Sequence, residues 1–374
     1  MTLTVVILMF AGGLTVRAEG ETKVDVEDSL LDSMNLDSVQ DAVDELLGDT
    51  SISFGDAIKE LIKGDHPFSG ENMKNMVQAL LEAAWGTQKT IWINILILVL
   101  AASLFSSFSG VFNGQLGEMS FYLVYLLVFA LLVKNFATLS GELQNTLEGI
   151  VTFMQALTPA YFLAVATATG ASTAAMFYQI ILLVILLVER VLIYLVLPGI
   201  HVFVLLSFVN HLYKEDLMSK MAELLKNVIC WTMNTMLGLI VGLQVTRSLI
   251  SPALDSLKRT AIGKTAGAIP GVGNAINAVT EMVIGSAVLV RNCLGVAAVV
   301  ILFLCALQPV LHITITGLSY RFLAAFAQPV SDKRMVGALN SMGEGCGLLL
   351  KVLFTTEVLF LLTIAILAGT VSGA

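Results

Sequence analysis

Long apolar tracts constrain this chain more than any other feature. Two of them, Ala174–Val209 and Val283–Tyr320, are longer than the roughly 20 residues that cross the hydrocarbon core of a bilayer. Hydrophobic residues make up 57% of the chain, charged residues only 13%, and the mean hydropathy is +0.87. A soluble core cannot absorb this much apolar surface. The sequence therefore predicts an all-α, polytopic membrane protein.

Four shorter apolar tracts have the length of one membrane span each. They are Ile91–Phe108, Phe121–Ala137, Val228–Val245 and Leu348–Ala368. Each longer tract is either two tightly connected passes or one span with a broken extension, which gives about six to eight crossings. Three basic loops, around Lys220, Lys258 and Lys333, cannot all lie in the cytoplasm by simple alternation, and this favours double passes.

The N-terminal part of the chain differs from the rest. An apolar run, Leu3–Leu14, leads to a small residue at Ala18, so we expect residues 1–18 to be a signal peptide, although a retained anchor is the alternative because no basic residue precedes the run. Residues 19–90 hold 16 acidic and 5 basic residues. They predict an acidic, helical extracytoplasmic domain, followed by a multi-pass membrane domain over residues 91–374.

Three short amphipathic helices are expected in the acidic domain, one after Asp37, one ending at Gly64 and one after Ser69. Their narrow apolar stripes suit a small bundle or a docking surface for a partner. An acidic helical linker is the alternative.

The membrane part carries a candidate tandem repeat. Pro159 and Pro270 are 111 residues apart, and so are Pro198 and Pro309; each member of the second pair precedes a histidine by three residues, giving His201 and His312. The predicted repeats cover residues 151–245 and 262–361. Duplicated halves with proline-interrupted helices are typical of transporters, but prolines that merely kink two helices give the same pattern.

Between the predicted repeats lies a stretch rich in glycine. Its spacing favours close backbone approach and predicts a hinge or packing motif. The residues concerned are Gly263, Gly267, Pro270, Gly271, Gly273 and Gly285.

Ionisable residues inside apolar tracts are costly, so they are the default candidates for a pathway through the membrane. They are Glu189, Arg190, His201, His312 and Glu357. Local ion pairs and bonds to neighbouring carbonyls are the alternatives. Four cysteines lie in apolar stretches and form no recognisable motif. No metal site, cofactor site or catalytic constellation is predicted, and an enzyme is therefore not expected.

The run from Gly267 to Gly273 (GAIPGVG), followed by Val283–Gly295, resembles the stage III sporulation protein AE family of endospore-forming bacteria. The order of signal sequence, exported helical region and multi-pass block resembles that family over essentially the whole chain.

The resemblance implies a membrane subunit of a secretion-like channel complex between mother cell and forespore, located in the mother-cell membrane. It implies, as partners, other proteins of the stage III sporulation A operon (an ATPase, a platform-like protein and ring-forming subunits) and the forespore protein Q. A secondary transporter that moves a small solute between the two repeats is the alternative function. The transported substance, its direction, the stoichiometry and the exact topology do not follow from the sequence.

Overall fold

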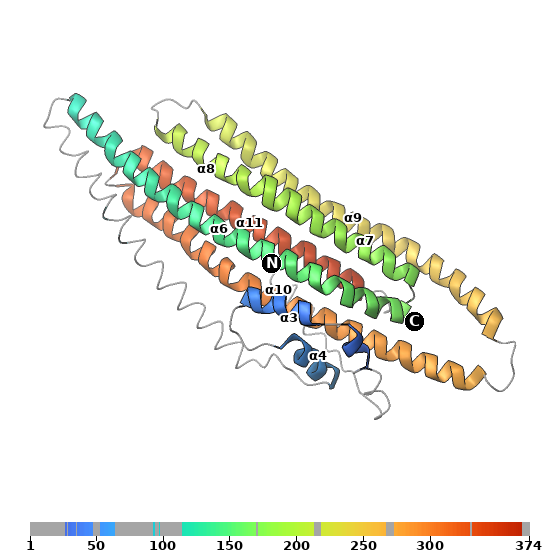
Figure 1. Ribbon diagram of the computed structural model, residues 1–374. Coiled ribbons are helices and arrows are strands. Elements are labelled where there is room, and N and C mark those ends of the chain that lie inside the picture. Colours follow the sequence, from blue (N-terminus) through green and yellow to red (C-terminus); the bar gives the residue numbers. More distant parts are fainter. Residues whose placement is uncertain are drawn as a thin grey trace.

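In the computed structural model, the described residues are 27, 29–34, 36–47, 53–63, 93, 97, 114–169, 171–212, 218–266, 273–329 and 331–368. Across these ranges every regular element is helical, which confirms the predicted all-α class. Long helices run side by side in an elongated bundle, and two short ones lie along one flank (Figure 1). The long elements are α6 (Gly114–Thr169), α7 (Ala171–Leu187), η1 (Val188–Val196), α8 (Leu197–Leu212), α9 (Ser219–Ala266), α10 (Gly273–Ala327) and α11 (Lys333–Ala368).

The tract predicted as Ala174–Val209 forms one continuous rod, in which the π-helix η1 joins α7 to α8. Pro198 explains the change of helix type. Proline has no N–H, and its ring would collide with the carbonyl four residues earlier in an ordinary α-helix. Widening the preceding turns relieves the collision, as the bond from the Leu197 N–H to the Leu192 carbonyl shows. The backbone thus stays hydrogen-bonded through the proline.

The second long tract, Val283–Tyr320, lies inside the single helix α10, which continues through Pro309. The double-pass prediction is therefore wrong for both tracts. Among the described residues, five helices are long and apolar enough to cross a membrane. The predicted span Ile91–Phe108 falls outside the described residues except for Ile93 and Ile97, which are both helical.

Helix α11 lies at the centre of the bundle, where it packs against α10, α8, α6 and α9. Glycines on α11 allow the close approach. A Cβ atom on Gly345 would lie 2.6 Å from Cγ2 of Val204 on α8 and 3.0 Å from Cε2 of Phe136 on α6. One on Gly343 would lie 2.8 Å from Cγ of Arg321 on α10. Glycines on α11 thus provide close packing of the small-residue kind.

The two short helices, α3 (Asp37–Leu47) and α4 (Phe54–Lys63), pack on α6 and α10. Leu46 of α3 covers Gly149 of α6, and the ring of Phe54 meets the ring of Phe153 edge-on, with centroids 6.1 Å apart. The predicted apolar stripes of these helices are therefore docking surfaces for the long helices of the same chain. The third predicted helix, after Ser69, lies outside the described residues.

The two predicted repeats contain the same order of elements. Helix α9 begins at Ser219 and α11 at Lys333, 114 residues later, and each follows a long helix that contains one of the paired prolines. The local geometry differs, because Pro198 follows a π-helix and Pro309 lies in an ordinary α-helix. The duplication stays a prediction.

Replacing Gly345 with alanine should destabilise the protein by about 1–3 kcal/mol, because the new methyl group has to displace Val204 and Phe136. Gly347→Ala is the matched control on the same helix, since its Cβ would lie 3.8 Å from the closest atom, Nη2 of Arg321. The measurement is the midpoint of thermal unfolding in detergent. Equal midpoints for the two variants would contradict this packing.

Candidate functional site

The predicted pathway residues are dispersed along the bundle. Glu189 and Arg190 lie in η1, half-buried and exposed respectively, and the Arg190 guanidinium stands 5.7 Å from the centre of the Tyr194 ring. This is a local cation–π contact on the outer surface. It favours a local interaction over a role of Glu189 and Arg190 in a pathway through the membrane.

The two histidines paired by the repeat have different surroundings. His201 packs edge-on against the Phe136 ring, with centroids 5.4 Å apart, and its Nε2 atom is buried without a hydrogen-bond partner among the described residues. His312 binds the Glu142 carboxylate through Nδ1, at 2.9 Å, and so links α10 to α6. Glu142 is half exposed, so this pair contributes little stability.

Glu357 is buried in α11, and in the part of the chain that the structure describes its Oε1 atom has no hydrogen-bond partner. The carboxyl lies close enough to Cys305 of α10 for an electrostatic interaction. Burying a carboxyl group among apolar side chains costs free energy. Of the five candidates, Glu357 is therefore the one whose position is hardest to explain by packing alone.

The glycine-rich stretch is only partly described. Gly263 lies in α9 and Gly273 begins α10, whereas Gly267, Pro270 and Gly271 lie outside the described residues. A Cβ on Gly285 would meet nothing within 4 Å. The close approach lies ten residues further along, where a Cβ on Gly295 would be 3.2 Å from the Tyr161 hydroxyl of α6 and 3.6 Å from Ile364 of α11.

Arg291, in the same family-like run, is a site residue that the sequence analysis missed. It is 1% exposed, it lies near Tyr161, and its Nη2 atom donates to the Asn292 side chain at 3.1 Å. A buried arginine in an apolar helix is the signal that could have identified it, because such a charge persists only where partners hold it. The run Val283–Gly295 thus forms the junction of α10 with α6.

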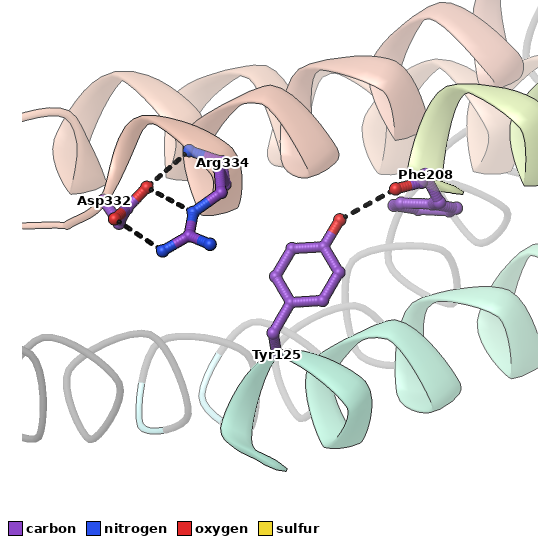
Figure 2. A network of polar contacts seen from close by, with 4 residues as sticks. All are labelled: Tyr125, Phe208, Asp332 and Arg334. Atoms are coloured by element: carbon purple, nitrogen blue, oxygen red, sulfur yellow. Dashed lines mark hydrogen bonds and ion pairs between the residues drawn. The ribbon is translucent and has the colours of Figure 1, made fainter. Parts of the chain in front are cut away.

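Polar contacts gather instead at the end of the bundle where α6 and α11 begin and α8 ends. Figure 2 shows Tyr125 of α6 donating from its hydroxyl to the Phe208 carbonyl of α8, at 3.1 Å. In the same view Asp332 accepts from the backbone N–H of Arg334, at 2.9 Å, and binds the Arg334 guanidinium. Asp332 therefore caps the first turn of α11.

Two further contacts tie α11 to its neighbours near this end. His211 of α8 meets the Ser341 hydroxyl at 3.1 Å, and Lys226 of α9 binds Glu344 at 2.9 Å. Helices α8 and α10 end, and α9 and α11 begin, at this same end, which brings the basic residues in the first turns of α9 and α11 to one end of the bundle (Figure 1). The three contacts between helices are not recognisable as a sequence motif, because each joins residues more than 80 positions apart.

Within the described ranges, no group of three metal-binding side chains converges. The structure has a group of polar contacts between helices at one end of the bundle, and α3 and α4 pack on one flank of it. Together with the five apolar helices, this arrangement defines an all-α polytopic membrane protein.

Comparison with known proteins gives the family. The model of the stage III sporulation protein AE family matches residues 52–371, and the chain belongs to this family. A curated relative, the stage III sporulation protein AE of Bacillus subtilis (strain 168), is 23% identical over 324 residues, which cover 84% of this chain and 80% of the relative. No solved structure matches. The protein accordingly has a role in sporulation.

Removing the Asp332 carboxylate should loosen the start of α11. Asp332→Ala is expected to cost about 0.5–2 kcal/mol, because the Arg334 N–H loses its cap and the guanidinium loses its bonds to the carboxylate. Asp332→Asn, which can still cap, is the control and should retain most of the stability. Thermal unfolding in detergent measures both variants, and equal losses would show that the cap contributes nothing.

Proposed function

We propose that this protein is an integral membrane subunit of a multiprotein, secretion-like channel complex that links mother cell and forespore during sporulation. It acts by assembly rather than by catalysis, and it lies in the mother-cell membrane around the forespore. Its partners are other proteins of the stage III sporulation A operon, namely an ATPase, a platform-like protein and ring-forming subunits, together with the forespore protein Q. Family membership and the role in sporulation support this proposal.

The observation that carries the proposal is the length of the helices. Helices α6, α9 and α10 contain 56, 48 and 55 residues. At about 1.5 Å per residue they span roughly 84, 72 and 82 Å, more than twice the thickness of the hydrocarbon core. The bundle must therefore reach well beyond one bilayer. Helical surfaces that extend out of the membrane can contact a soluble ATPase on one side and ring-forming subunits on the other.

The basic residues support an orientation for this subunit. Lys220 and Lys226 of α9 share one end of the bundle with Lys333 and Arg334 of α11. The far half of α9 carries the third basic cluster, Arg247, Lys258, Arg259 and Lys264. Cytoplasmic loops carry an excess of basic residues, and two of the three clusters lie at the first end, so in our proposal that end faces the mother-cell cytoplasm. An ATPase would then approach the end of the bundle where α11 makes its polar contacts with α8 and α9.

A secondary transporter is the second candidate function. The π-helix η1, with Glu189 and Arg190 inside an apolar rod, is the observation that favours it. Transporter sites, however, use backbone groups freed where a helix unwinds, and the bond from Leu197 to Leu192 shows that η1 keeps its hydrogen bonding. A transporter would bind a solute or ion as the purified subunit alone, whereas a complex subunit would not.

Deleting the gene in its sporulating host should abolish heat-resistant spores, and a tagged copy should restore them. The tagged protein, solubilised in mild detergent from sporulating cells, should bring the ATPase and the ring-forming subunits with it. The same tagged protein expressed in vegetative cells is the control. Normal spore yields after deletion, or a tagged protein that purifies alone from sporulating cells, would refute the proposal.

A further inference from the structure

Two ring contacts fix the level at which α6 lies against the antiparallel rod of α7, η1 and α8. The rings of Phe162 and Tyr178 have centroids 5.7 Å apart, and those of Phe136 and His201 are 5.4 Å apart. Between these contacts, 26 residues of α6 rise roughly 39 Å, which exceeds the 30 Å hydrocarbon core. The surfaces of the two rods can therefore be compared over a full membrane thickness.

Over this length the exposed surface of α6 is polar. Its exposed residues recur every three or four positions and form one line along the helix, which we name the α6 stripe: Thr138, Glu142, Asn145, Glu148, Thr152 and Gln155. Only Ala137 and Pro159 are exposed beside them. The large apolar residues that α6 exposes all come before this segment, up to Leu127.

Over the same length the exposed surface of the antiparallel rod is apolar. Its large exposed residues form the α7–α8 stripe: Tyr178, Leu182, Leu183, Leu186, Tyr194 and Leu195. Gln179 and Arg190 are the exceptions, and Arg190 lies over the Tyr194 ring. A surface of this composition is the one that a lipid bilayer requires.

Helices α3 and α4 give an independent indication. They pack on α6 and α10 at this same level, since Leu46 covers Gly149 and Phe54 meets Phe153. Their outward faces carry exposed charges, including Asp41, Asp44 and Glu45 of α3 and Lys59, Glu60 and Lys63 of α4. Charged side chains in such numbers are not accommodated in hydrocarbon. The outward faces of α3 and α4, which lie beside the α6 stripe at Gly149 and Phe153, are consequently in contact with water.

We infer that the α6 stripe borders a water-filled passage through the membrane, while lipid contacts the α7–α8 stripe at the same level. The stripe carries charges of one sign, Glu142 and Glu148, among neutral polar groups, and Glu142 is held by His312. One stripe makes one wall of such a passage, and in the proposed complex other protein chains complete it. That part of the inference deepens the proposed function and rests on it.

Cysteine accessibility tests the inference directly. Single cysteines replace Asn145 or Thr152 of the α6 stripe, and Leu183 or Leu186 of the α7–α8 stripe, in a full-length chain whose four native cysteines are alanine. Membranes from sporulating cells are opened by freezing and thawing and exposed to a positively charged, membrane-impermeant methanethiosulfonate. Variants that do not restore sporulation are replaced by cysteines at Glu148 or Leu182.

Cysteines on the α6 stripe should react roughly ten-fold or more faster than those on the α7–α8 stripe, because both the reagent and the thiolate need water. Equally fast reaction would place this segment outside the bilayer, and equally slow reaction would mean that protein or lipid seals the stripe; either result overturns the inference. Failure of the proposed function is distinguishable, since it would appear as missing partners in the co-purification while the labelling difference persisted.

Discussion

The close contact of α11 with its neighbours is the interaction on which the rest of the structure depends. Inside a membrane, apolar side chains gain little by leaving lipid, so helices associate through tight packing and a few polar bonds. Gly343 and Gly345 provide the tight packing by letting α10, α8 and α6 approach the α11 backbone. Asp332, Ser341 and Glu344 provide polar bonds to residues on α11 itself, α8 and α9. Helices α10, α8, α6 and α9 are thereby held around a common element.

Composition and the length of apolar tracts were enough to predict the helical class, the membrane location and most of the spans. Hydropathy could not show that Ala174–Val209 and Val283–Tyr320 are single helices, because it measures affinity for lipid and does not limit a helix to the bilayer. Proline suggested interruptions at Pro198 and Pro309. In one case a π-helix absorbs the proline, and in the other the α-helix simply continues through it.

The candidate site was harder to predict for a physical reason. His201 and His312 share a position in the sequence pattern, yet one meets an aromatic ring and the other a carboxylate, because their neighbours come from α6 at different heights. Arg291 and the glycines of α11 matter through contacts with residues far away in sequence. The α6 stripe could not be recognised in the sequence because the apolar residues of the buried faces lie between its members. Only the bundle shows which of these faces is turned outward.

The unbroken course of α10 has a mechanical consequence. A helix of 55 residues is a stiff rod about 82 Å long, and it packs against α11 and α6. Tilting such a rod by about 5° at one end moves the other end by roughly 7 Å. A force applied to α10 on one side of the membrane therefore displaces its other end by more than a helix radius. This needs no local unfolding of the helix.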